Sequence, residues 1–262
     1  LAVPLFLLMS NVLLKGGVGK DLFSAVQSWV GHWPGGLGIA TILSCGIFSA
    51  ISGSSVATAA TIGTVAMPEM ESRGYERSFI LGLLAAGGTL GIMIPPSIPL
   101  IIYGVITESS IPTLFMAGIG PGLSLIIIFI AFSIYSAKKS GFQAAPKATL
   151  QERYRATIMA MPTIGLAVAI IGSIYMGLAT PSESAGVGFV LSLIITISMG
   201  RMNWAKIVEA TEDSMKTTIM VFMIVAGAKV FSYAITLYRI PQDISQLITQ
   251  NISNPTIFIL VI

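Results

Sequence analysis

The chain has 262 residues, of which 54% are hydrophobic and only 10% are charged, with a net charge of +3 and a mean hydropathy of +0.88. Soluble domains carry about 25% charged residues, so this sequence cannot cover a surface that faces water. The composition predicts an integral membrane protein in a lipid bilayer. The small positive charge gathers in short loops and does not indicate a nucleic-acid partner.

Long runs without Asp, Glu, Lys or Arg predict membrane-spanning helices. They cover residues 22–68, 78–107, 109–137 and 156–182. No alternation of period two favours barrel strands, so the predicted fold class is all-α. The chain opens and closes within apolar helical sequence, and we expect a fragment that lacks both ends of a longer polypeptide.

The first 35 residues are expected to form the end of a helix, over 1–14, and an amphipathic arm at the membrane interface. Trp29 and Trp33 lie in this arm, and tryptophan is enriched at membrane interfaces. His32 is interpreted as a polar residue of the same interface rather than a catalytic one.

Two apolar segments over 36–51 and 55–67 are each too short to cross a bilayer comfortably. They meet at Ser52–Ser55 and predict a re-entrant hairpin over 36–67. After a charged loop, the run 78–107 is interrupted between Gly87 and Ser97. Pro95 and Pro96 lack an N–H group, so this interruption predicts a broken helix.

A transmembrane helix over 118–137 and a basic loop over 138–155 follow, within a region that spans 108–155. The loop carries five Lys or Arg and one acid, so we place it in the cytoplasm. The remaining sequence predicts two spans, a surface helix over 201–216, a span over 217–238 and an interfacial helix over 240–254. Glu183 is interpreted as a helix-start residue. Lys229 is either a functional intramembrane charge or a side chain that reaches the interface.

A weak internal repeat relates residues 6–29 to residues 231–252. Each copy reads as an apolar helix, a basic residue, a turn and an interfacial helix. The predicted topology places Lys15 inside and Arg239 outside, which makes the copies inverted. Inverted repeats are typical of secondary transporters.

Helix breaks at membrane depth leave carbonyl groups at one end and N–H groups at the other. Each unpaired group costs several kcal/mol in an apolar medium, so a ligand can stabilise the break. Carbonyls and hydroxyls suit a hard cation such as sodium, and helix N-termini suit a carboxylate. The alternative is close packing of small residues and a proline kink with no ligand.

These motifs resemble one known family. "GIFSAISGSSVATAATIGTVAMPEMESRGY", "AAGGTLGIMIPPSIPLIIYG", "TPSESA" and "RIPQ" are similar to the large permease subunit of the tripartite ATP-independent periplasmic (TRAP) transporters, DctM-like, across essentially the whole chain. The resemblance implies an inverted-repeat, elevator-type symporter of the bacterial or archaeal inner membrane. Such a transporter imports small organic acids, dicarboxylates among them, with Na+ as coupling ion and no tightly bound cofactor. Its partners are a small membrane subunit and a periplasmic solute-binding protein.

The resemblance also implies site residues and domains. Residues 36–107 would form half of a transport domain, residues 1–35 and 156–262 scaffold helices and the start of a second repeat. The second hairpin would lie outside this chain. Ser52 and Ser97 would face the substrate carboxylate. The sodium site would comprise Ser52, Gly53, Ser54, Ser55, Gly88, Thr89, Gly91 and Pro95.

Three alternatives stay open at this point. The first is a sodium/carboxylate elevator transporter that works without a binding protein. The second is an intramembrane serine protease, prompted by the Gly53–Ser54 turn, with His32 as the only histidine to serve as a base. The third is a passive scaffold subunit, which would have no need for broken helices.

Overall fold

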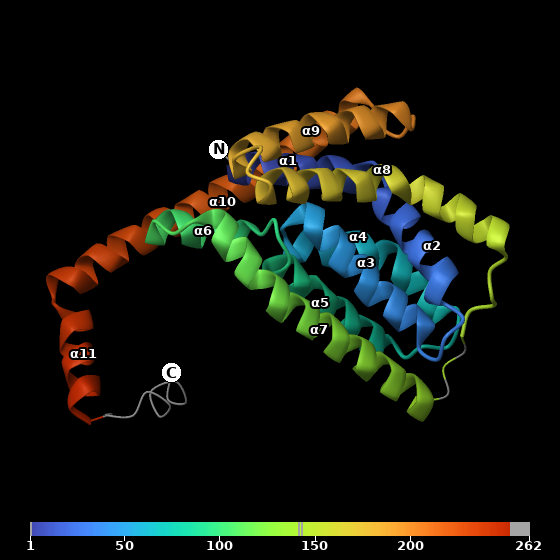
Figure 1. Cartoon of the computed structure of the whole chain (residues 1–262), viewed down its shortest axis with the longest axis horizontal. Coiled ribbons are helices and arrows are strands. Elements are labelled where there is room, and N and C mark those ends of the chain that lie inside the picture. The colour runs from blue at the N-terminus through green and yellow to red at the C-terminus, as the bar shows by residue number, and fades with distance from the viewer. Residues whose placement is uncertain (1, 141, 143, 252–262) are drawn as a thin grey trace. The chain divides into compact units, whose positions relative to one another are not determined.

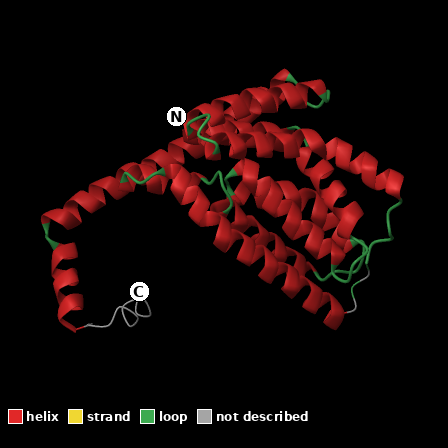
Figure 2. Cartoon of the chain, viewed as in Figure 1, coloured by secondary structure: helices red, strands yellow, loops and turns green. Residues whose placement is uncertain are grey.

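The computed structural model describes residues 2–140, 142 and 144–251, and these residues form helices without any strand (Figure 2). They divide into two units, residues 1–215 and 216–262, which are considered separately. The helices are α1 (Ala2–Lys15), α2 (Val18–Val30), α3 (Gly36–Ser52), α4 (Ser55–Glu71), α5 (Arg77–Met93), α6 (Ile98–Thr107), α7 (Ile111–Ser140), α8 (Leu150–Tyr175), α9 (Pro181–Ser198), α10 (Trp204–Leu237) and α11 (Ile240–Asn251). The predicted all-α class is confirmed.

Five helical segments of the described chain are long and apolar enough to cross a membrane. They are α7, α8, α9, α10 and the pair α5–α6 taken as one segment, and α1 with α2 would add a sixth. Helices α1 and α2 are bent by 70° relative to each other, at a turn where Gly17 adopts a φ of 67°. Glycine tolerates this left-handed conformation, which explains why α1 ends there.

Helix α3 is the centre of the first unit. Fifteen of its residues are buried, and it packs against α2, α4, α5 and α7 (Figure 1). Helix α1 packs mainly on α9, and α8 packs on both α2 and α9. Since α3 carries no charged residue, it can be enclosed on all sides, as its continuous apolar sequence predicts.

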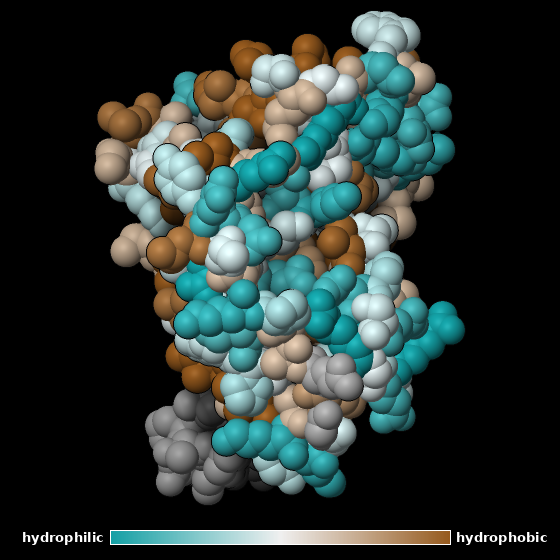
Figure 3. Space-filling model, turned by 90° about the vertical axis from the view of Figure 1, so that its right-hand side faces the viewer, coloured by the Kyte–Doolittle hydropathy of each residue, from teal (hydrophilic) through white to brown (hydrophobic). Residues whose placement is uncertain are grey.

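The loops that are rich in charge lie on one side of this unit. In Figure 1 the α4–α5 loop, the α7–α8 loop and the α9–α10 linker all lie toward the right. Figure 3 views that side and shows hydrophilic residues gathered across it. This arrangement agrees with the prediction that these loops share one side of the membrane, and their cytoplasmic placement stays a prediction.

Helix α10 differs from its prediction. A surface helix over 201–216 and a separate span over 217–238 were expected, but Trp204–Leu237 is one continuous helix of 34 residues. The prediction of two helices is wrong because no proline interrupts this stretch. Its charged first turns instead form ion pairs, since Glu209 and Asp213 both contact Lys15. Lys229 lies exposed on the same helix, within the second unit.

The two copies of the weak repeat are helix–turn–helix pairs, α1–α2 and α10–α11. Gly17 and Arg239 both adopt a positive φ at the turns, 67° and 57°. The inverted relation between the copies stays a prediction, because they belong to different units.

Two membrane helices begin with the same capping motif. Thr180 and Glu183 form the predicted cap of α9, and Thr149 and Glu152 form an unpredicted one on α8, shortening the basic loop to 141–149. In each, the threonine hydroxyl accepts from the glutamate N–H and the glutamate accepts from the threonine N–H.

Replacing the cap threonine should destabilise either helix. We expect Thr149→Ala and Thr180→Ala each to lower the free energy of unfolding of the full-length subunit by about 1 kcal/mol, because helix N–H groups lose their acceptor. Reversible unfolding in mixed micelles measures this change. Thr107→Ala is the control, because Thr107 lies exposed at the C-terminal end of α6. An equal effect of all three variants would contradict the prediction.

Candidate functional site

The hairpin tip and the helix break meet, so that four helix ends lie together. Helix α3 ends at Ser52 and α4 begins at Ser55, while α5 ends at Met93 and α6 begins at Ile98. The Ile98 N–H donates a hydrogen bond to the Gly53 carbonyl oxygen, with the two atoms 3.2 Å apart. Two helix C-termini with partial negative charge and two N-termini with partial positive charge therefore share one region.

Three glycines allow the backbones to approach this closely. A Cβ atom on Gly91 would lie 2.7 Å from both the carbonyl carbon and oxygen of Ser54, and 2.9 Å from the Ser55 nitrogen. One on Gly88 would lie 3.0 Å from the Ser55 carbonyl oxygen. Gly53 has a φ of 59° and faces the Pro96 carbonyl oxygen. At Gly53 and Gly91 only glycine fits, because the atoms that a Cβ would meet under 3.0 Å belong to the backbone, and Gly88 is tight as well.

The two serines predicted to face substrate are fully buried. The Ser52 hydroxyl lies 2.8 Å from the Thr58 hydroxyl and 3.4 Å from the Ser54 backbone nitrogen. The Ser97 hydroxyl donates to the Ile92 carbonyl oxygen at 2.5 Å and accepts from the Leu100 N–H at 3.5 Å. Both hydroxyls hold the turn in which they lie, and Ser97 caps the N-terminus of α6.

Ser54 plays the corresponding part at the hairpin tip. It is the N-cap of α4, and its hydroxyl accepts from the Ala57 N–H at 3.4 Å. Ser54 and Ser55 are half-buried, so the tip remains reachable. The N–H groups in the first turn of α4 therefore offer donors for an anion.

The helix break supplies carbonyl groups without helical partners. In a continuous helix the Gly91 and Ile92 carbonyls would accept from residues 95 and 96, but these are prolines, joined by a cis peptide bond. The Ser97 hydroxyl donates a hydrogen bond to the Ile92 carbonyl oxygen instead. The Gly91 carbonyl thus has no helical hydrogen-bond donor. Gly91 itself lies close to the backbone of Ser54 and Ser55.

Most of the predicted sodium-site residues lie at this junction. The contacts join Gly53, Ser54 and Ser55 of the tip with Gly88 and Gly91 of α5, and Pro95 is buried in the break. Thr89 does not join them: its side chain is exposed, and its hydroxyl donates to the Ala86 carbonyl oxygen at 2.6 Å. It lies on a different face of α5 from Gly88 and Gly91.

Two further residues at the junction were not predicted. Thr58 is fully buried against Ser52, and the spacing Thr58–Thr61 along one face of α4 was the available signal. Ser49, one turn before the tip, is fully buried, and its hydroxyl has no hydrogen-bond partner among the described residues. A buried hydroxyl without a partner is unusual, and Ser10 and Ser44 share this state elsewhere in the described chain.

The donor set of the junction fits a small hard cation. It consists of backbone carbonyls and serine or threonine hydroxyls, with no charged side chain in residues 49–58 or 88–98. Half-helix C-termini and unwound carbonyls are the groups that coordinate Na+ in secondary transporters, and half-helix N-termini bind anionic substrate groups. The broken helix and hairpin thus define a multi-pass membrane protein of the transporter class.

The chain matches the family model described as "Tripartite ATP-independent periplasmic transporter, DctM component" over residues 1–262, and it belongs to this family. It is a multi-pass protein of the inner membrane. The family resemblance found in the sequence is confirmed.

Three similar proteins cover between 93% and 100% of the chain. It is 38% identical to the C4-dicarboxylate TRAP transporter large permease protein DctM of Pseudomonas aeruginosa, over 100% of this chain and 62% of the relative. It is 36% identical to the ectoine/5-hydroxyectoine TRAP transporter large permease protein UehC of Ruegeria pomeroyi, over 93% of this chain and 57% of the relative. It is 33% identical to the sialic acid TRAP transporter large permease protein SiaM of Vibrio cholerae, over 100% and 62%. The chain thus spans about 60% of the length of these relatives. They are named as permeases, so the protease alternative is excluded.

Proposed function

We propose that this chain carries the first coupling-ion site of a TRAP permease subunit that imports small organic acids with sodium. One observation carries the proposal: four helix ends meet where Gly91 lies close to the Ser54–Ser55 backbone, and the prolines leave the Gly91 carbonyl without its helical donor. The site contains neutral oxygens only, which suits a monovalent cation. The relatives' printed substrates, C4-dicarboxylate and sialic acid among them, support an organic acid as substrate.

In this mechanism Na+ is bound by the carbonyl ends of α3 and α5 and by nearby hydroxyls. Its charge then favours a carboxylate at the N-termini of α4 and α6, where Ser54 and Ser97 order the first turns. Because each ligand neutralises helix-end charge of opposite sign, binding of one favours binding of the other.

Elevator movement is part of the proposal. Helices α3, α4 and α5 pack on one another, while α1 packs mainly on α9. The first group would move as a body against the second. A periplasmic binding protein would deliver the substrate, and a small membrane subunit would support the scaffold. The family's description as a tripartite periplasmic transporter supports these two partners.

Uptake by the complete transporter tests the proposal. The full-length subunit and its small partner are placed in proteoliposomes with an inward Na+ gradient, and radiolabelled organic acids are offered with and without the binding protein. Uptake that requires both Na+ and the binding protein supports the proposal. Uptake without the binding protein would favour the binding-protein-independent alternative, and uptake indifferent to Na+ would contradict the ion site.

The cap serines should be needed for sodium-driven uptake. We expect Ser54→Ala and Ser97→Ala each to lower uptake about tenfold and to raise the Na+ concentration for half-maximal rate, because removing an N-cap costs about 1 kcal/mol and loosens the helix end. Ser124→Ala on α7 is the matched control, since that serine is exposed and bonds only to the Gly120 carbonyl. Unchanged uptake in both site variants would refute the assignment.

A further inference from the structure

A second site lies away from the junction, on the side that bears the charged loops. A cavity of about 450 Å³ opens between the α1–α2 turn and the α9–α10 linker. Four cationic side chains line it: Lys15, Lys20, Arg201 and Lys206. Its volume falls in the range of about 300–1,000 Å³ that is usual for small-molecule sites. The mechanism proposed above makes no use of this cavity.

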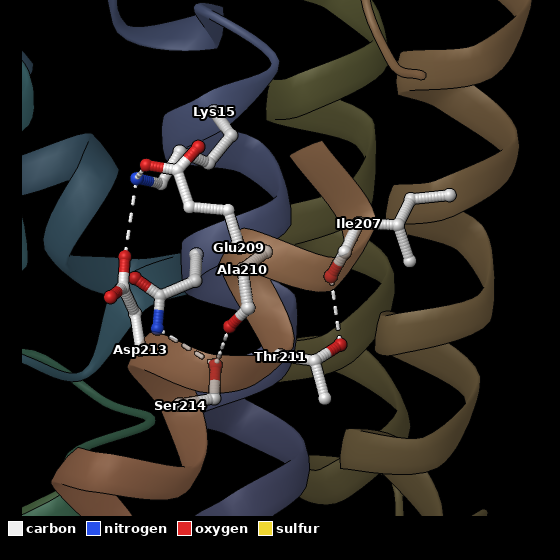
Figure 4. A network of polar contacts seen from close by, with 8 residues as sticks. Lys15, Ile207, Glu209, Ala210, Thr211, Asp213 and Ser214 are labelled. Carbon is white, nitrogen blue, oxygen red and sulfur yellow. Dashed lines mark hydrogen bonds and ion pairs between the residues drawn. The ribbon is translucent and has the colours of Figure 1, made fainter. Parts of the chain in front are cut away.

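Three carboxylates lie near these cations, but none of them lines the cavity. Asp21 pairs with Arg201 through both of its oxygens. Lys15 lies between Glu209 and Asp213, as Figure 4 shows, with distances of 2.5 and 3.1 Å. The carboxylates therefore hold Lys15 and Arg201 in place from behind the cavity wall.

The other two cations are not neutralised by an ion pair in the described part of the chain. Lys20 is exposed. The Lys206 ammonium donates only to the Arg201 carbonyl oxygen, at 2.8 Å, and retains two further N–H donors. Four cations against these three carboxylates leave a net charge of +1, and Lys20 and Lys206 are the two cations that no ion pair engages in the described residues.

The backbone keeps the cavity open. Gly17 and Gly200, on opposite walls, each adopt a φ of 67° and carry no side chain that could fill it. The side-chain oxygen Oδ1 of Asn203 accepts a hydrogen bond from the Lys206 backbone N–H, at 2.9 Å, which holds the Asn203 side chain in place. The site is thus built from ordered turns rather than from scattered surface lysines.

The cavity lies where membrane helices end. Helices α1 and α9 terminate at its walls and α10 begins there, with Trp204 77% exposed just beyond. Exposed tryptophan marks the headgroup level of a bilayer, and the cytoplasmic leaflet is rich in anionic lipid. Lysine is a common point-charge ligand of phosphate.

We propose that this cavity binds a phosphate-bearing anion, and that the phosphate belongs to the headgroup of an anionic phospholipid of the cytoplasmic leaflet. Such a lipid would bridge α2 and α10 and stabilise the packing of the scaffold helices. The alternative source of the same chemistry is free phosphate from the cytoplasm, which the experiment separates.

Lipid binding to the full-length subunit with its small partner tests the proposal. The apparent Kd for short-chain phosphatidylglycerol is measured by thermal shift in neutral detergent. We expect Lys20→Gln/Lys206→Gln to weaken binding about tenfold or more, because both ammonium groups line the cavity and can bond the phosphate directly. Lys138→Gln/Lys139→Gln is the matched control: these lysines are exposed at the end of α7, outside the cavity. Lys20→Glu alone, which removes no internal contact, serves if the double variant fails to fold.

Each outcome decides the proposal. Weakened phosphatidylglycerol binding in the cavity variant alone, with no stabilisation by phosphatidylcholine, supports it. Equal weakening in both double variants, or in neither, overturns it. Inorganic phosphate that binds as tightly as the lipid, with the same loss in the cavity variant, overturns the lipid source.

Discussion

Replacing Gly91 by alanine should reduce sodium-driven uptake by about tenfold to a hundredfold. The added Cβ would lie 2.7 Å from the Ser54 carbonyl group, and a backbone group cannot turn aside as a flexible side chain can. Overpacking of this kind costs about 1–3 kcal/mol. The hairpin tip would be displaced from the break, and the ion ligands with it. Uptake in proteoliposomes and the Na+ concentration for half-maximal rate are the measurements.

Gly82→Ala is the control for this variant because it lies on the same helix and its Cβ would meet nothing within 4 Å. Alanine favours helix over glycine by up to about 1 kcal/mol, so Gly82→Ala should keep its activity and gain slight stability. If Gly91→Ala also kept its sodium-driven uptake, the close approach of the hairpin tip to the helix break would not be required for transport.

Removing Arg201 should give the largest loss of stability among the charged residues. Its partner Asp21 has a side chain only 8% exposed, while Arg201 is 30% exposed. The hydrogen bond to the Asp21 carboxylate raises the pKa of the Arg201 guanidinium, so the guanidinium remains charged at neutral pH. Breaking a buried pair costs about 3–5 kcal/mol, and partial exposure reduces our expectation for Arg201→Gln to about 2–3 kcal/mol.

The free energy of unfolding of the full-length subunit measures this effect. Arg77→Gln is the matched control, since Arg77 lies 3.8 Å from Glu71 in a pair that is 75% and 44% exposed, and should cost less than about 1 kcal/mol. Asp21→Asn/Arg201→Gln should recover part of the loss, because it removes the uncompensated charge. Equal costs for the two arginine variants would mean that the buried pair contributes no more than a surface one.

The outline of the fold could be read from the sequence because hydropathy and charge report directly on burial in a bilayer. The uncharged runs became α3–α5, α7 and α8, and "TPSE" became the cap of α9. The continuity of α10 across residues 216 and 217 could not be predicted in the same way. Charges at residues 206–216 indicated a surface helix, but a single helix can carry charged and apolar turns in succession.

The site was predicted in part, for reasons that differ between residues. Gly88 and Gly91 are three positions apart and share a helix face, whereas Thr89 is turned by about 100°, so helical periodicity alone separates them. The Thr58–Thr61 spacing indicates a polar face of α4, but the Ser52–Thr58 contact crosses the hairpin tip, and a spacing within one helix does not identify a partner on another. The role of Gly91 depends on how closely Ser54 approaches, which only the assembled structure gives.

The oxygens of the junction have a consequence for the choice of energy source. Residues 49–58 and 88–98 contain no His, Asp, Glu, Lys or Arg, so nothing there takes up or releases a proton near neutral pH. A proton gradient therefore has no side chain to act upon at this half of the site. If the junction binds Na+ as proposed, its carbonyl and hydroxyl dipoles would select by ionic radius and charge density, and the affinity for the ion would vary little across the physiological pH range.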